Sequence, residues 1–380
     1  MIKKTTILKQ LDATFGAVAC GLTSLFVSQN HSHASRRSEP LAAVNRILVI
    51  RPGGLGDMIL AIPVLRAIAR TYPNAEIDLA GESRNVVVVP DDTVSGQRYC
   101  FDVHPFQFLR ALRTRRYDVV VDLEQFHHFS AIFSWFTRAH TRVGFRINPR
   151  RNNLYTHLVD YDLDGFEGQE FMRTLEPLGV NESAYRLEGT LLVPGSSGEE
   201  GGVPTVAICT ASSTRHKRWE RERMVQLIQK IVQDRGHRVV LVGNEQEREE
   251  ADWVIQEVGL QEQGHVTNVV GQGGLDQVAR TLAAADCFIG CDSGLAHMSV
   301  AVGTATVVLF GPSDERKWGH QGPRHQIVRE SLSCSPCAMF GYYKRCQSIA
   351  CMKAISVEDV LRAMDRVLGE QRVTDSLVVG

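Results

Sequence analysis

The sequence predicts an α/β protein built from two doubly wound parallel sheets. Three observations support this prediction. Short runs of aliphatic residues alternate with helical stretches from Arg46 onward. These runs are apolar throughout instead of alternating with polar residues, which is typical of parallel strands covered by helices on both faces. The pattern also occurs twice, on either side of a Gly/Ser/Pro-rich stretch at 194–204 that we interpret as a linker.

The elements of the first half follow from this periodicity. Residues 58–72 carry isoleucine and leucine at helical spacing directly after the first strand-like run. Strands are predicted at 46–51, 75–81, 86–90 and 117–124, and a second helix at 106–116. We therefore place one domain at residues 45–194.

The second half, residues 195–380, repeats the alternation more regularly. Strands are predicted at 206–209, 237–243, 265–271, 287–290 and 305–310, and helices at 220–234, 245–259, 275–285 and from Leu295. Ser356 is expected to cap a terminal helix. In doubly wound sheets ligands bind beyond the carboxyl ends of the strands, so the loops at those ends are the places to search for a site.

The first 44 residues are predicted to form an amphipathic helix followed by a polar linker. One helical stripe contains Leu8, Leu11, Phe15, Val18, Leu22 and Leu25. The apolar stretch is too short to span a bilayer, and Asp12 interrupts the approach that a cleaved signal sequence would need. Two interpretations are favoured over a cleaved signal sequence. The segment is either a helix docked on the protein body or an interfacial anchor on anionic lipid.

Charge and cysteine content exclude some classes of protein. The chain has 42 Lys and Arg against 43 Asp and Glu, which argues against a general nucleic-acid binder. Residues 104–151 nevertheless hold nine basic against three acidic residues, enough for a basic face toward an anionic glycolipid or a membrane. Nine cysteines, an odd number, favour a reducing compartment.

Two of the strand-end loops are candidate sites. Residues 51–57 contain Gly53, Gly54 and Gly56, which permit a close approach, and end at Asp57. This spacing matches neither a dinucleotide-binding motif nor a P-loop, so a tight turn with a helix cap is the alternative. Residues 210–219 place hydroxyls and cationic side chains before a helix, which suits an oxyanion or a diphosphate. A solvated polar loop is the alternative there.

The third loop is at residues 291–297. Ser293 and Gly294 open a short helix whose free amides would face an anion, and His297 lies one turn along the same face. Asp292 would sit poorly against a phosphate, so we expect it to orient backbone or hydroxyl groups.

These segments together resemble glycosyltransferase family 9, the heptosyltransferases of lipopolysaccharide core assembly. The resemblance runs from about residue 46 to 361 and rests on RILVIRPGGLGDMILAIPVLRAI, SSTRHKRW and DSGLAHMSVAVGTATVVLFGPSD, with Trp318 beyond. It implies the GT-B architecture, two Rossmann-like domains facing a central cleft. It also implies that the first domain receives the acceptor and the second the nucleotide sugar, typically ADP-heptose, without a metal in the chemistry.

The resemblance further implies an inverting transfer with individual residue roles. Asp57 matches the presumed general base, and Lys217 matches the lysine that stabilises the leaving diphosphate. Donor-binding positions are Ser213, Thr214, Arg218, Glu247, Asp292, Ser293, Gly294 and His297, and the close-approach loop on the acceptor side is Gly53, Gly54 and Gly56. Gly319 and His320 stand where typical members carry proline, which leaves the donor open.

Four cysteines near the end form the pattern C-x2-C-x8-C-x4-C, at Cys334, Cys337, Cys346 and Cys351. The first pair has the spacing of a structural zinc site. Labile disulfides, or free thiols packing a loop, are the alternatives, and no catalytic role is expected. No cofactor is expected for the chemistry itself.

The predicted function is therefore transfer of heptose, or a related sugar, from ADP-heptose or a similar nucleotide sugar to an anionic glycolipid. The expected location is the cytoplasm, with peripheral association with the inner membrane. A catalytically silent nucleotide-sugar or glycan-binding protein is the main alternative. An oxidoreductase using the first strand and helix is a second alternative, but its glycine spacing is wrong.

Overall fold

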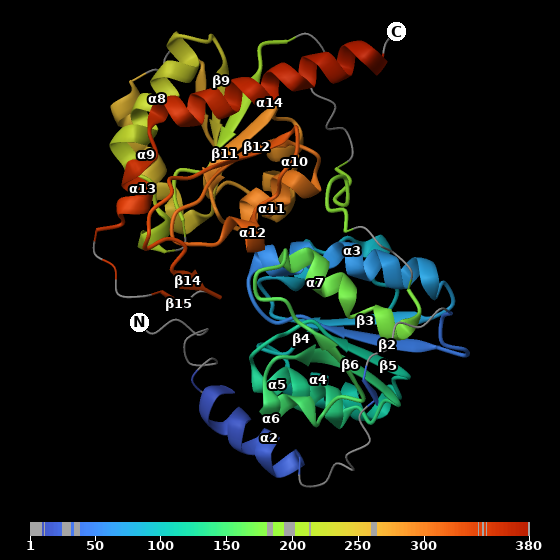
Figure 1. The fold of residues 1–380 in the computed structure, drawn as a ribbon. Helices are drawn as coiled ribbons and strands as arrows, with labels where there is room; N and C mark the ends of the chain where they lie inside the picture. Colours follow the sequence, from blue (N-terminus) through green and yellow to red (C-terminus); the bar gives the residue numbers. More distant parts are fainter. Residues whose placement is uncertain are drawn as a thin grey trace. The chain divides into compact units, whose positions relative to one another are not determined.

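The protein is described from a computed structural model. The structure describes residues 10, 12–24, 32–33, 39–180, 185–193, 202–212, 214–259, 264–340, 342–343, 346 and 348–378. The chain divides into two compact units, Met1–Arg186 and Leu187–Gly380, each an α/β unit with one main parallel sheet (Figure 1). The predicted two-domain α/β fold is confirmed. Within the described ranges, every helix is too short or too polar to cross a membrane.

Unit 1 contains a seven-stranded sheet in the order β1-β7-β6-β5-β2-β3-β4, with all neighbouring strands parallel. The strands are β1 Ser32–His33, β2 Arg46–Ile50, β3 Glu76–Gly81, β4 Arg98–Cys100, β5 Val119–Asp122, β6 Thr141–Arg146 and β7 His157–Asp160. Ile50 pairs with both Ala80 and Asp122. The carboxyl ends of three neighbouring strands therefore meet at one edge, which is where a doubly wound sheet binds its ligands.

Helices cover both faces of this sheet (Figure 1). One face carries α3 Leu55–Thr71 and α7 Glu167–Arg173, which pack against each other. The other carries α4 Pro105–Thr114, α5 His128–Phe136 and α6 Pro149–Asn152. Leu48, Ile50 and Val120 of the strands pack with Phe108 and Leu112 of α4 on that second face. Short 3-10 turns lie at η2 Val86–Val88, η3 Asp91–Thr93 and η4 Glu176–Leu178.

The N-terminal segment, η1 Asp12–Gly16 followed by α2 Ala17–Ser24, docks on this second helical layer. The Asp12 carboxylate accepts the backbone N–H groups of His128 at 2.8 Å and Phe129 at 2.7 Å, which caps the start of α5. Cys20 is buried among Ala131 and its neighbours. These contacts agree with the interpretation of this segment as a helix docked on the protein body. Leu8, Leu11 and Leu25 of the predicted stripe lie outside the described residues.

The strand predicted at 86–90 is wrong, because this segment forms the turn η2. The side-chain oxygen of Asn85 accepts the N–H of Glu82 at 2.9 Å, and the N–H of Val86 donates to the Glu82 carbonyl at 3.1 Å. Arg98 donates to the carbonyl of Val86 at 3.2 Å. These bonds use the backbone groups that a strand would need, and β4 occupies the sheet edge instead.

Unit 2 contains a six-stranded parallel sheet in the order β10-β9-β8-β11-β12-β13. The strands are β8 Thr205–Ile208, β9 Arg238–Leu241, β10 Val266–Asn268, β11 Cys287–Cys291, β12 Ala305–Leu309 and β13 His325–Val328. Beyond them lies a small antiparallel pair, β14 Ala338–Met339 and β15 Tyr342–Tyr343.

The helices of unit 2 are α8 Arg221–Gln233, α9 Arg248–Val258, α10 Leu275–Ala283, α11 Gly294–Ala301, α12 Glu315–Trp318, α13 Ala350–Ala354 and α14 Val357–Val378, with 3-10 turns η5 Arg215–Lys217 and η6 Glu245–Glu247. Helices α8, α9 and α14 share one large core with alternate residues of the strands. Helix α11 packs against β11 and β12, and α10 packs against α11 (Figure 1). Ser356 caps α14 as predicted, because its hydroxyl accepts the N–H of Asp359 at 3.1 Å.

The two units divide between Arg186 and Leu187, whereas the sequence places the boundary at 194/195. The difference has a physical reason. Leu187 is buried, and the N–H of Leu191 donates to the carbonyl of Ala301 at 2.9 Å. These contacts attach the segment before the predicted linker to unit 2. Most of the linker itself lies outside the described residues.

Candidate active site

In unit 1 the loop after β2 holds Asp57 in a tight turn. Oδ2 of Asp57 accepts the N–H of Gly54 at 2.8 Å, so the carboxylate caps the first turn of α3. Gly53 has φ +120°, a conformation that L side chains rarely adopt, and a Cβ on Gly53 or Gly54 would lie about as close as 3.0 Å to that oxygen. Gly56 is half-buried in the same helical turn. The helix cap that was the alternative interpretation of this loop is therefore present. The Asp57 side chain is nevertheless 24% exposed, so a substrate can reach it.

Beneath this loop lies a buried arginine that the sequence analysis did not assign to the site. Nη2 of Arg51 donates to Oδ1 of Asp57 at 2.6 Å, and Nη1 donates to the carbonyl of Leu123 at 2.9 Å. Nη1 also lies 3.4 Å from Oε2 of Glu124. Burial lowers the pKa of Arg51, but the carboxylates of Asp57, Glu124 and Glu167 more than offset this and raise it above its ordinary value. Arg51 therefore provides a fixed positive charge beside Asp57.

The neighbouring loop after β5 is organised by Glu124. Its Oε1 accepts the backbone N–H groups of Gln125 at 3.0 Å, Phe126 at 2.9 Å and His127 at 3.2 Å. Burial raises the pKa of Glu124, but His127 and Arg51 lower it well below the ordinary range. Glu124 is thus an ionised partner of Arg51. The two strand-end loops of unit 1 are tied to each other through that arginine.

In unit 2 the structure brings together two of the predicted residues, Lys217 and Asp292. Nζ of Lys217 donates to Oδ2 of Asp292, which is buried at the end of β11. Burial raises the pKa of Asp292, but the Lys217 ammonium, with His297 and the Ser313 hydroxyl, lowers it below its ordinary value. Asp292 therefore orients a cation as well as a hydroxyl, which corrects the expectation of backbone or hydroxyl partners alone. Lys217 remains about one-fifth exposed.

Two buried hydroxyls lie at the ends of the adjacent strands β8 and β11. Ser293 is the N-cap residue of α11, and neither its hydroxyl nor that of Ser212 has a hydrogen-bond partner among the described residues. Gly294 then begins α11. Buried hydroxyls without a protein partner are expected where a ligand supplies one. The sequence pattern favours Ser213, the neighbour of Ser212 in this loop, as the donor-binding serine; Ser213 lies outside the described residues.

The remaining predicted donor residues are arranged around this loop. Thr214 caps η5. Arg218 is exposed, donates to the carbonyl of Ser212 at 3.1 Å, and is close enough to Glu247 to lower its pKa. Burial outweighs that effect, so the pKa of Glu247 is raised. Oε2 of Glu247 accepts the N–H of Asn244 at 3.0 Å.

His297 faces a second histidine, His320, with Nδ1 and Nε2 3.0 Å apart. Burial, together with the charges of His297 and His325, lowers the pKa of His320 well below its ordinary value. His320 is therefore neutral at physiological pH. It supports His297, which in turn lies near Asp292.

The cysteines do not form a metal site in the part of the chain that the structure describes. No group of three or more metal-binding side chains is found there, and the cysteines there are free thiols. Cys334 is exposed, whereas Cys351 is buried, and its Sγ would lie 3.1 Å from a Cβ placed on Gly311. The described arrangement does not fit a four-thiolate site, and structural zinc stays a prediction.

Comparison with known proteins identifies the family. The model of glycosyltransferase family 9 (heptosyltransferase) matches residues 106–345, more than half of the chain. The chain belongs to glycosyltransferase family 9. It is therefore a glycosyltransferase enzyme, and its two α/β units have the GT-B fold of the solved heptosyltransferases.

Relatives of this family 9 glycosyltransferase agree with that assignment. Lipopolysaccharide heptosyltransferase 2 of Escherichia coli K12 is 26% identical over 291 residues, which cover 70% of this chain and 83% of the relative. The solved ADP-heptose lipopolysaccharide heptosyltransferase II of E. coli superposes with a TM-score of 0.66 at 21% identity, covering 86% of this chain and 99% of that one. The E. coli heptosyltransferase WaaC with ADP gives 0.66 at 18% identity, with coverages of 84% and 99%.

Proposed function

We propose that this family 9 enzyme transfers heptose from ADP-heptose to a lipopolysaccharide core glycolipid with inversion at the anomeric carbon. The observation that carries the proposal is the set of anion-binding groups that follow β8 and β11. It combines the Lys217 ammonium, held by Asp292, with the unpartnered hydroxyls of Ser212 and Ser293. Related heptosyltransferases solved with ADP and with ADP-2-deoxy-2-fluoro heptose support the choice of an ADP-sugar.

The residues on the donor side are proposed to stabilise the negative charge of the leaving diphosphate. As the glycosidic bond to the sugar breaks, negative charge builds on the leaving diphosphate. The Lys217 ammonium lies beside that position in the proposed mode, and the hydroxyl of Ser293 and the first amides of α11 donate to phosphate oxygens. Asp292 keeps the lysine in place before the substrate binds. Glu247 is proposed to accept ribose hydroxyls with its remaining carboxylate oxygen.

The residues on the acceptor side are proposed to remove the proton of the attacking hydroxyl. Asp57 is proposed to accept the proton of the attacking hydroxyl as the new glycosidic bond forms. Arg51 and the N–H of Gly54 fix the carboxylate, so that its orientation is set before the acceptor arrives. The glycines of the loop leave room for the acceptor sugar. No metal ion takes part in this proposal, since Lys217 provides the positive charge that the leaving group needs.

The enzyme is proposed to act in the cytoplasm at the inner face of the inner membrane, where a lipid-linked acceptor is accessible. Within the segment 104–151, the exposed arginines support a basic acceptor-side surface, among them Arg110, Arg116 and Arg138.

Calorimetric titration of the purified protein with ADP-heptose, UDP-glucose and GDP-mannose tests the donor class. We expect ADP-heptose to bind at least about 10-fold more tightly than the other two, and we expect Lys217→Met and Ser293→Ala to weaken that binding. Arg238→Gln, an exposed change on β9, is the control for each variant and should leave binding unchanged. Equal binding of all three nucleotide sugars, or unaltered binding by both variants, contradicts the proposed donor site.

A further inference from the structure

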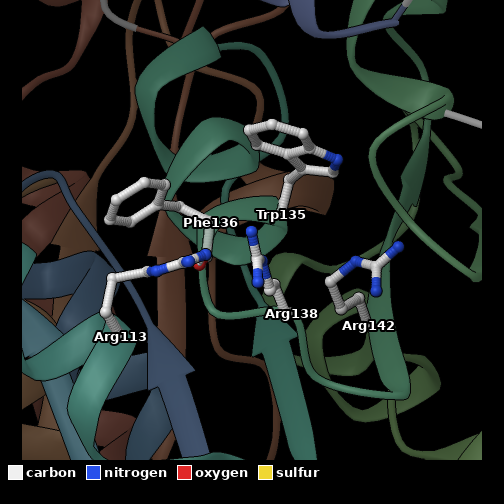
Figure 2. Close-up of a pocket in the computed structure, with 5 residues that line it drawn as sticks. All are labelled: Arg113, Trp135, Phe136, Arg138 and Arg142. Atoms are coloured by element: carbon white, nitrogen blue, oxygen red, sulfur yellow. Dashed lines mark hydrogen bonds between the residues drawn. The ribbon is translucent and has the colours of Figure 1, made fainter. Parts of the chain in front are cut away.

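Unit 1 contains a pocket of about 410 Å³ that the transfer reaction does not use. It is lined by Arg113, Trp135, Phe136, Arg138 and Arg142 (Figure 2). These residues belong to the last turns of α4 and α5, to the turn before β6, and to the start of β6. The pocket therefore lies at the amino-terminal edge of the sheet. Asp57 and Arg51 lie at the carboxyl edge, so the pocket is separate from the candidate active site.

The three arginines of this pocket differ from the ion-paired arginines of unit 1. Several guanidiniums of the unit pair with carboxylates, as Arg46 and Arg115 do with Glu76. Arg113, Arg138 and Arg142 form no ion pair with any described carboxylate, and no acidic residue lines the pocket. Other paired arginines of the unit are Arg51, Arg66, Arg84, Arg98, Arg146, Arg151 and Arg173. Three positive charges without a counter-charge suit an anionic ligand.

The aromatic side chains give the pocket an amphipathic character. The Arg113 guanidinium lies over the Phe136 ring, 4.9 Å from the ring centroid. This is within the reach of about 6 Å of a cation–π interaction. Arg113 also donates to the carbonyl of Phe136 at 3.4 Å. Trp135 is half-buried and packs against the small core that contains Cys20 of α2. Trp135 therefore connects the pocket, through this core, to the docked N-terminal helix.

That helix presents an apolar stripe to the outside. Phe15 is 67% exposed, Val18 63% and Leu22 58%, at spacings of three and four residues. The opposite side of the same helix is the one that docks, through Asp12 and Cys20. An amphipathic helix whose apolar side faces outward is unusual for a helix stabilised only by packing on its own protein.

We propose that this surface, which we call the α2–α5 surface, docks on a bilayer that contains anionic phospholipid. It consists of Phe15, Val18 and Leu22 together with the pocket arginines. The apolar stripe enters the boundary between headgroups and acyl chains, and the arginines bind lipid phosphates. A soluble phosphate compound would use the arginines but would leave the stripe exposed. The inference deepens the membrane location in the proposed function, and its test does not depend on turnover.

Sedimentation with vesicles tests the proposal on the full chain. Vesicles are made of phosphatidylcholine with and without phosphatidylglycerol, and the protein bound to each is measured. The charge variant is Arg113→Gln with Arg138→Gln. Arg142 is kept, because its Nε donates to the carbonyl of Leu154 at 2.9 Å and fixes the start of β6. The apolar variant is Phe15→Ser with Leu22→Ser.

Each variant has a matched control elsewhere on the surface. Arg186→Gln with Arg238→Gln removes the same charge from exposed positions, and Val87→Ser with Leu192→Ser removes exposed apolar side chains. We expect the parent to prefer the anionic vesicles, both test variants to bind them at least about 10-fold more weakly, and both controls to match the parent. ADP-heptose affinity measured by calorimetry should be unchanged in both test variants.

Several results would overturn the inference. These are equal binding to both vesicle types, test variants that bind like their controls, and a parent that binds soluble glycerol phosphate but no vesicles. Capture of a protein partner by the α2–α5 surface in place of vesicles would overturn it as well. If the protein binds vesicles as expected but transfers no sugar, the proposed function fails and this inference stands.

Discussion

The carboxylate of Asp57 is held on both of its oxygens, with Arg51 donating to Oδ1 at 2.6 Å and the N–H of Gly54 donating to Oδ2 at 2.8 Å. The arginine is buried and reaches from β2 to the loop after β5. A base must be correctly placed before its basicity matters. Arg51 is therefore the residue that connects the fold of unit 1 to the proposed chemistry of Asp57.

Replacing Arg51 should lower kcat more than it changes KM. Arg51→Met removes the donor to Asp57, and we expect kcat to fall by roughly 10²-fold, as for other misplaced catalytic groups. Arg51→Lys keeps the charge without the planar fork and should recover part of the rate. The pH profile of kcat should shift in Arg51→Met, which a purely structural role would not produce. Unchanged kcat and pH profile in a folded Arg51→Met variant would refute the positioning role.

Asp292 gives the protein a pH-dependent contribution to stability with a defined sign. Its pKa in the folded state lies below the ordinary value of 3.8, because Lys217 outweighs the effect of burial. The ionised form therefore stabilises the folded state above about pH 4, and this stabilisation is lost as the pH falls through the folded-state pKa. Asp292→Asn should have a lower Tm than the parent at pH 7. That deficit should shrink as the pH is lowered toward 3, in thermal scans at matched ionic strength. A deficit that is constant with pH would contradict the pairing.

The buried ion pair of Arg151 and Asp122 should dominate the stability of the second helical layer of unit 1. Arg151 is completely buried, and its Nη2 donates to Oδ2 of Asp122 at 2.9 Å, which also accepts the Tyr155 hydroxyl at 2.6 Å. Arg151→Met leaves a buried carboxylate without its cation, so we expect the free energy of unfolding to fall by about 3–5 kcal/mol. Urea denaturation measures this.

The double variant Arg151→Met with Asp122→Asn is the matched comparison. It removes the stranded charge and should recover part of the loss. Arg150→Met, an exposed change on the same helix, should have little effect. A single Arg151→Met variant as stable as the parent would show that the pair contributes nothing.

The sequence predicted those elements whose burial is continuous along the chain. The strands beginning at Arg46 and Cys287 are uninterrupted apolar runs, and both are found. The strands β6 and β7 were not predicted, because Arg142, Arg146 and His157 interrupt their pattern. The run at 86–90 has strand composition but forms a turn, because the Arg98 guanidinium donates to its backbone carbonyls at Val86 and Pro90. Distant hydrogen bonds of this kind leave no local signal in the sequence.

Contacts between residues that are distant in the sequence also determine the candidate site, and they too leave no local signal. Lys217 and Asp292 were each predicted, but their pairing joins positions 75 residues apart, and it changes the role expected for Asp292. Arg51 contacts Glu124 across 73 residues, and nothing in the loop motif indicates that contact. The one sequence signal for Arg51 as a site residue is its position directly after a buried strand. Ser212 could have been found as a hydroxyl in the same loop as Ser213.

Asp57 is proposed to act as the base in heptose transfer from ADP-heptose. The most direct test incubates the parent and Asp57→Asn with ADP-heptose and a lipopolysaccharide core glycolipid, and follows ADP release and the mass of the glycolipid. We expect the parent to release ADP and add one heptosyl unit per acceptor. Asp57→Asn should lose about 10²- to 10⁴-fold in kcat while binding ADP-heptose as the parent does in calorimetry. A parent that binds ADP-heptose but never transfers it, or an Asp57→Asn variant with normal turnover, would contradict the account.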